Sequence, residues 1–203
     1  MVPLAIDPTK EKIMSFFEMP TPLAARRLFL NRSGGLVLSG AAVALLAGNN
    51  ALAAKADDAK KGDITILNTA LGAEFEAIAA YQVGAESKLL ETAVLNLAVS
   101  FQGHHKEHAA MLAKTIVSLG GKAVNAKEKY NFPVETLKTQ ADVLRFAANL
   151  ERGAVSAYLG AVPLFGNRDL AKAAASILGD EAMHWAILRQ AVGEVAVPSA
   201  FMS

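Results

Sequence analysis

The sequence predicts an all-α protein whose main domain is an antiparallel four-helix bundle with a long crossover between its second and third helices. Apolar residues make up 53% of the 203 residues and only seven residues are proline, which favours helices around one core. Four segments carry apolar side chains every three to four residues, as the buried face of a helix does. The link between the second and third segments is too long for a tight turn.

The first two helices are expected between residues 63 and 119. Asp63 is a suitable N-cap for the first helix, which should run to about Ser87. The second helix follows after a short break and should end at Leu119, because two glycines come next. The apolar face of the first helix carries Leu67, Leu71, Glu74, Ile78, Tyr81 and Ala85, and that of the second carries Val94, Ala98, Phe101, His105, His108, Leu112 and Ile116.

The crossover and the last two helices follow. Residues 120–138 contain glycine, asparagine and proline without sustained periodicity, so we expect them to run along the bundle. The third helix should extend from about Gln140 to Val162 and stop at Pro163, and Asn167 can cap the fourth. The face of the third helix carries Leu144, Ala148, Glu151, Val155, Tyr158 and Val162, and that of the fourth carries Leu170, Ala174, Ile177, Glu181, His184 and Leu188.

A polar set of side chains appears twice on these apolar faces. Each copy has a Glu, a Tyr seven residues later, and then two residues spaced three apart on the next helix. The first copy is Glu74, Tyr81, His105 and His108, and the second is Glu151, Tyr158, Glu181 and His184.

The buried position of this set predicts its chemistry. An ionised carboxylate in an apolar interior must be paired, protonated or bound to a metal, and no Arg or Lys lies on the same faces. Glu and His repeated at helical spacing are typical of a metal site between four helices. Imidazole and carboxylate groups suit iron, manganese or zinc. The expected ligands are Glu74, His105, His108, Glu151, Glu181 and His184.

The pattern resembles the ferritin-like superfamily, in which two helices each give one Glu and the other two each give Glu-x-x-His. Glu181-Ala-Met-His184 matches that motif in full, and Glu74 and Glu151 match the single-carboxylate positions. The likeness covers about residues 63–192 and looks most like the exported, desiccation-related branch, distantly like rubrerythrin. It implies a dinuclear iron or manganese site with two ions per chain, zinc being an alternative. It also implies redox chemistry with dioxygen or peroxide.

One position departs from this pattern. His105 stands where the family has a bridging Glu, and a neutral imidazole binds one metal whereas a carboxylate can bridge two. Glu181 is therefore the expected bridge. The change also favours a second interpretation, a non-catalytic metal-binding or stress-related structural protein on the same fold. A third is an apo bundle whose buried polar residues bond only to one another.

The neighbours of the set have less specific roles. Tyr81 and Tyr158 should either pack in the core with the hydroxyl bonded to another helix, or donate hydrogen bonds to the ligands. His104 and Glu107 are expected to be exposed or hydrogen-bonded to the ligands. The chain has no cysteine, which excludes disulfides and thiolate sites. Its net charge of +1, with scattered basic residues, argues against nucleic-acid binding. A homo-oligomer is compatible with the pattern.

Residues 1–53 have the order of an export signal. Arg26 and Arg27 precede an apolar stretch of residues 34–48, and Ala51-Leu52-Ala53 is a small-x-small cleavage pattern. The paired arginines resemble the twin-arginine motif, whose route carries folded proteins. We therefore expect a mature domain of residues 54–203 that is periplasmic or secreted. The apolar run is shorter than the ~20 residues needed to span a bilayer, so no stable span is expected after cleavage, and an uncleaved anchor is the alternative.

Overall fold

The computed structural model describes residues 56–202, with side chains from residue 58 onward. Within these residues it contains four long helices and no strand, which confirms the predicted all-α four-helix bundle. The predicted export segment, including Arg26 and Arg27, lies outside the described residues. None of the described helices is long and apolar enough to cross a membrane. The helices are α4 (Ala56–Glu86), α5 (Thr92–Ser118), α6 (Gln140–Ala161) and α7 (Arg168–Ala191).

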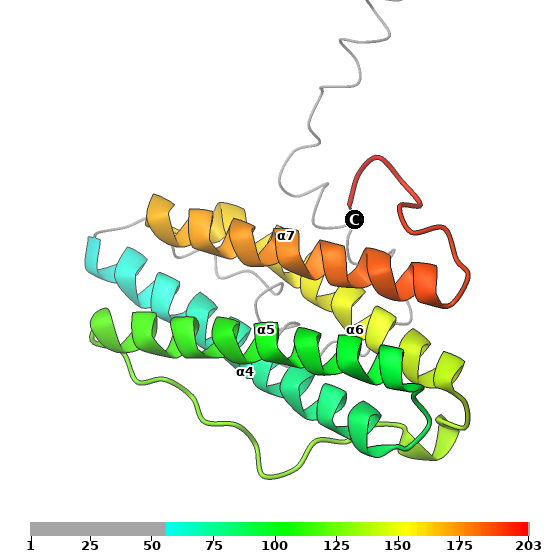
Figure 1. Ribbon diagram of the computed structural model, residues 1–203. Helices are drawn as coiled ribbons and strands as arrows, with labels where there is room; N and C mark the ends of the chain where they lie inside the picture. The colour runs from blue at the N-terminus through cyan, green and yellow to red at the C-terminus, as the bar shows by residue number, and fades with distance from the viewer. Residues whose placement is uncertain (1–55, 203) are drawn as a thin grey trace, which may run out of the picture. The chain divides into compact units, whose positions relative to one another are not determined.

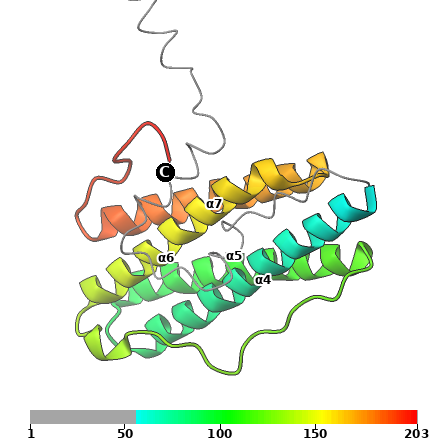
Figure 2. The same cartoon turned by 180° about the vertical axis from the view of Figure 1, so that it is seen from behind.

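The four helices form two hairpins. α4 packs against α5, α6 packs against α7, and α4 also contacts α6. The crossover from the end of α5 runs the length of the bundle to the start of α6 (Figure 1), and the view from behind shows α4 and α6 side by side (Figure 2). α5 and α6 therefore run in the same direction, as a long crossover requires.

The crossover is tied to the bundle and its ends are capped. The Asn68 side-chain amide donates to the Lys122 carbonyl oxygen at 3.1 Å, and the amide oxygen accepts from the Val124 N–H at 2.8 Å. A single 3-10 turn, η2 (Val134–Thr136), interrupts it. Thr139 and Asp142 then form a capping box at the start of α6. These bonds satisfy backbone groups that a free loop would leave to water.

The start of α4 differs from the prediction. The helix begins at residue 56, and Asp63 is buried within it rather than capping it. Its carboxylate accepts hydrogen bonds from the Gly166 N–H at 2.8 Å and the Asn167 N–H at 3.0 Å. The Ala and Lys residues before Asp63 favour a helix, so the helix extends past the position where an N-cap was expected. Asn167 caps α7, as predicted, by accepting from the Asp169 N–H.

The core is divided into two apolar clusters, one on each side of the polar set along the helices. One cluster contains Leu71, Leu112, Tyr158 and Ile177, among others. The other consists of Tyr81, Phe101, Leu144, Ala148 and Leu188. Because both ends of the bundle are apolar, they hold the helices rigidly while the polar residues between them remain shielded from water. α6 ends at Ala161 and continues as the turn η3 (Val162–Leu164), which leads to α7.

Candidate metal centre

The structure brings all six residues predicted as ligands into one polar layer, with each of the four helices contributing. Glu74 comes from α4, Glu151 from α6, and a pair each from α5 and α7. Five of the six are no more than 3% exposed, whereas the side chain of His108 is 15% exposed. The helical register assigned from the sequence therefore places these side chains correctly inside the bundle.

Four of these residues form a first group: Glu74, His105, His108 and Glu181. The Nδ1 atom of His105 lies 2.9 Å from Oε2 of Glu74, and Nδ1 of His108 lies 3.2 Å from Oε1 of Glu181. One ligand atom from each of the four lies within 4.8 Å of the others. That spacing is compatible with a single ion bound by all four, because ligand bonds are about 2.0–2.2 Å long.

A second group consists of His105, Glu151, Glu181 and His184. The Nδ1 atom of His184 lies 3.4 Å from Oε1 of Glu151 and 3.4 Å from Oε2 of Glu181. Nε2 of His105 lies 3.3 Å from the same Glu151 oxygen. Phe101 stacks on the His184 ring with 4.0 Å between the ring centroids, which limits how far that ring can turn. The layer thus offers two neighbouring four-residue positions.

Glu181 and His105 belong to both groups. Glu181 turns Oε1 toward His108 and Oε2 toward His184, an orientation compatible with the carboxylate bridge expected from the sequence. His105 turns Nδ1 toward Glu74 and Nε2 toward Glu151. The sequence had placed His105 in the α4–α5 half alone. The repeat assigns each residue to one copy and does not show which residues of the other copy lie close to it. A neutral imidazole has one unprotonated nitrogen, so only one of the two groups can use it.

Four buried polar atoms of this layer have no hydrogen-bond partner within the described residues. They are Nδ1 of His108, Nδ1 of His184 and both carboxylate oxygens of Glu181. An unsatisfied buried polar atom costs about 1–3 kcal/mol, and more when it is charged. All four atoms face the two groups, where a metal ion would satisfy them together. The donor set therefore fits bound metal ions, consistent with the expected metal centre.

The two tyrosines hold the carboxylates from across the bundle. The Tyr158 hydroxyl donates to Oε1 of Glu74 at 2.6 Å, and the Tyr81 hydroxyl donates to Oε1 of Glu151. Each tyrosine thus bonds the glutamate of the other copy, so the hydroxyl is bonded to another helix and also donates to an expected ligand. Burial, together with the charges of the bonded carboxylates, raises the pKa of both hydroxyls well above the usual range. Both therefore stay protonated as donors.

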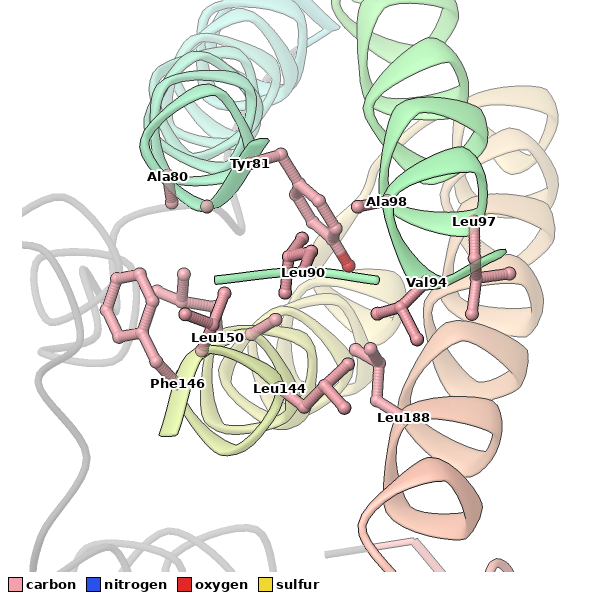
Figure 3. A pocket seen from close by; sticks show the side chains of 13 residues that line it. Ala80, Tyr81, Leu90, Val94, Leu97, Ala98, Leu144, Phe146, Leu150 and Leu188 are labelled. Carbon is pink, nitrogen blue, oxygen red and sulfur yellow. The ribbon is translucent and has the colours of Figure 1, made fainter. Parts of the chain in front are cut away.

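An apolar cavity of about 20 Å³ lies against Tyr81 at one end of the bundle. Figure 3 shows aliphatic side chains such as Val94, Leu144 and Leu188 around it, with the tyrosine ring forming part of the wall. A comparable cavity of about 30 Å³ lies against Tyr158 at the other end. Each has room for about one small molecule. Each tyrosine therefore separates an apolar cavity from a carboxylate of the polar layer.

Asp180 also contacts this layer, although the sequence pattern did not single it out. Its Oδ2 atom lies 3.2 Å from Nε2 of His184 and 3.5 Å from Nε2 of His108. These are the outward nitrogens of the two imidazoles whose Nδ1 atoms face the groups. A carboxylate at the far nitrogen of a ligand histidine fixes its tautomer and orientation. The available signal was the position of Asp180 four residues before His184, one helical turn away on the same face.

His104 also reaches this part of the structure, although it was expected to be either exposed or hydrogen-bonded to the ligands. Its side chain is 43% exposed, and Nδ1 lies 3.1 Å from Oδ2 of Asp180 and 2.9 Å from Nε2 of His184. Glu107, for which the same two expectations were stated, is exposed. His104 therefore meets both expectations, because it is exposed at the surface and also contacts the ligand His184.

The charges in the layer are strongly coupled. Burial alone lowers the pKa of each imidazole, but the surrounding glutamates outweigh it and raise the pKa of His105 to about 11 and those of His108 and His184 to about 9. Burial and the charge of Glu151 outweigh the imidazoles at Glu181 and raise its pKa to about 7. Burial would also raise the pKa of Glu151, but the neighbouring imidazoles of His105 and His184 lower it below the usual range.

Comparison with known proteins assigns this fold and layer to a family. The sequence pattern of the ferritin-like domain matches residues 62–194, which includes all six expected ligands. The chain therefore belongs to the ferritin-like domain family, as the resemblance predicted.

A solved structure from another organism has a similar fold. The crystal structure of a conserved hypothetical protein from Mycobacterium tuberculosis superposes with a TM-score of 0.61 at 22% sequence identity, over 70% of this chain and 99% of that one. At this identity the similarity establishes the fold alone. No curated protein sequence gives a significant match.

Proposed function

We propose that this protein is an exported ferritin-like protein that binds two iron or manganese ions in the polar layer and carries out redox chemistry with dioxygen or peroxide. The observation that carries the proposal is the set of buried atoms on His108, Glu181 and His184 that make no hydrogen bond and face the two groups. A fold that leaves four such atoms in its centre loses stability, so a ligand that pairs with all of them at once is the simplest reason for their presence.

Each residue of the layer has a role in this proposal. Glu74 and His108 would hold one ion, Glu151 and His184 would hold the other, and Glu181 could be a ligand to both. His105 would use its free nitrogen for one of the two. When bound, iron or manganese would supply the exchange of electrons; zinc fits the same donors but does not change its redox state. Tyr81, Tyr158 and Asp180 keep the donors in place.

The cavities beside the tyrosines favour dioxygen as the oxidant. Their walls are mostly apolar, and Tyr81 forms part of the wall of the one shown in Figure 3. Dioxygen is apolar and gains by leaving water for such a space. Peroxide is polar and would lose hydrogen bonds there. Ferrous-iron oxidation by dioxygen is therefore the better-supported reaction, and peroxide removal is the second.

Iron oxidation can be measured directly. Protein freed of metal and loaded with ferrous iron without air should, on mixing with dioxygen, form ferric iron faster than free iron does. Absorbance in the near ultraviolet and an oxygen electrode would follow the reaction. Glu181→Ala should reduce the rate to that of free iron, whereas Glu107→Ala, an exposed carboxylate on α5, should not. Equal rates with and without the wild-type protein would refute the redox proposal.

The second candidate is a non-catalytic structural protein, and the contacts of His105 are the observation in its favour. A protonated His105 ring pairs with Glu74 through Nδ1 and with Glu151 through Nε2, so it can neutralise charge in the layer without a metal. In that case the metal-free and metal-loaded proteins should melt at similar temperatures and neither should consume dioxygen. A large rise of the melting temperature on loading would support the metal centre instead.

The export part of the proposal rests on the sequence alone. Replacing both Arg26 and Arg27 by Lys should leave the precursor in the cytoplasm, because the twin-arginine pair is what that export route recognises. Cell fractionation with an antibody would measure it, and N-terminal sequencing of the exported protein should find a start near Ala54. An unimpaired export of the double variant, or an exported protein that still carries Met1, would contradict this prediction.

A further inference from the structure

A second set of metal-ligand side chains lies on the outer side of the layer. Asp180 brings Oδ2 within 3.1 Å of Nδ1 of His104 and 3.2 Å of Nε2 of His184. Together these three residues, called here the outer group, have ligand atoms within 4.8 Å of one another. Nε2 of His108 lies 3.5 Å from the same Asp180 oxygen. One carboxylate and several imidazoles are donors that suit a divalent transition-metal ion.

Exposure rises steadily from the buried layer through the outer group. The side chain of Glu181 is 0% exposed and that of His184 2%, whereas His108 is 15%, Asp180 23% and His104 43% exposed. The remaining expected ligands, Glu74, His105 and Glu151, are almost fully enclosed. Among the described ligand residues, those between α5 and α7 therefore form the side of the layer that faces solvent.

We propose that His104 and Asp180 form a separate capture site for a divalent transition-metal ion, from which the ion passes inward between His108 and His184. The inference rests on the buried centre proposed above. In this arrangement the capture site holds an ion with few protein ligands and with water in the remaining positions, so the ion exchanges readily. The single negative charge of Asp180 raises the local concentration of cations at the mouth of the layer.

The two nitrogens of His184 explain why an ion would move from the outer group to the buried centre. Nε2 faces the outer group, while Nδ1 faces Glu151 and Glu181. A neutral imidazole has one free nitrogen, so His184 can serve the outer ion or the inner one, but not both. Once Nδ1 binds the inner ion, the Nε2 hydrogen is donated to Asp180, which holds the ring in place. Filling of the inner position thus withdraws one ligand from the outer ion.

The capture site can be separated from the buried centre by replacing His104. Its exposed side chain belongs to the outer group alone, so His104→Ala should leave the fold and the final occupancy of the buried centre unchanged. With Co²⁺ as the only metal and stopped-flow absorbance as the measurement, loading should slow by about tenfold. The matched control is Glu107→Ala, which removes an exposed carboxylate from the same helix and should load at the wild-type rate.

The location of the ion can be tested in crystals. Anomalous diffraction from crystals of the wild-type protein soaked briefly in Co²⁺ should show a peak between His104 and Asp180, and the peak should be missing in His104→Ala. If wild type and His104→Ala load at the same rate and neither shows the outer peak, the capture site is refuted while the buried centre stands. If the wild-type protein binds no Co²⁺ at all, the buried centre itself is refuted.

Discussion

Replacing Glu181 with Ala should remove both ions from the protein. This residue offers one oxygen to each group, so its loss takes a ligand from each at once. Loss of a residue that only supports a metal ligand already costs about 10–100-fold in affinity. For the shared ligand itself we expect a loss of at least about 100-fold for each ion. Calorimetric titration with Mn²⁺ and metal analysis of the purified variant would measure this effect.

The melting temperature of a variant shows whether it has lost only a metal ligand or has lost its fold. The carboxylate of Glu181 makes no hydrogen bond, and burial together with the charge of Glu151 raises its pKa to about 7, so its ionised form is disfavoured in the metal-free protein. Glu181→Gln, which keeps the shape without the charge, should therefore melt at or above the temperature of the metal-free wild-type protein. A second variant, His105→Glu, adds the carboxylate that the family pattern has at this position and should tighten metal binding, because a further anionic ligand attracts the cations. Two ions retained in Glu181→Ala, together with none in His105→Glu, would disprove the bridge.

Metal binding should also strengthen steeply as the pH rises from 6 to 9. The pKa values of His105, His108 and His184 are raised to between about 9 and about 11. These imidazoles therefore carry protons at pH 7 in the metal-free protein, and a bound metal must displace protons from the nitrogens that it uses. Each displaced proton changes the apparent affinity by up to about tenfold per pH unit, and affinity falls as the solution becomes more acidic.

Two measurements would test this coupling. Titration with Mn²⁺ at several pH values gives the slope of affinity against pH, and loading in a weak buffer with an indicator dye gives the number of protons released. His108→Gln removes one titrating ligand and should reduce both numbers. An affinity that stays constant between pH 6 and pH 9, with no release of protons, would mean that the imidazoles are not ligands.

The sequence predicted the helices and the layer because both depend on periodicity. A Glu or His that replaces an apolar residue at its helical position must point inward with the rest of that face. Glu74 and Glu151 are examples, since each is at most 3% exposed. Family membership then follows from the same residues, because the matched segment of 62–194 contains them.

Contacts between helices could not be predicted in this way. Whether Tyr81 reaches Glu74 or Glu151 depends on how far two antiparallel helices are shifted along each other, and periodicity within one helix carries no information about that shift. The same holds for Asp180, whose contact with His108 lies between α7 and α5. The early start of α4 was missed for a different reason, because Asp63 is a good N-cap whose carboxylate serves the connection before α7 instead.

The crossed tyrosine bonds bear on how such a chain could arise. Tyr81 of the first hairpin bonds Glu151 of the second, and Tyr158 of the second bonds Glu74 of the first. In each hairpin the glutamate accepts a hydrogen bond from the tyrosine of the other hairpin, not from its own tyrosine. These are the reciprocal contacts that two identical hairpins would make about a twofold axis. The arrangement is the one expected from duplication and fusion of a gene encoding a single dimer-forming hairpin, with His105 and Glu181 marking where the two halves later diverged.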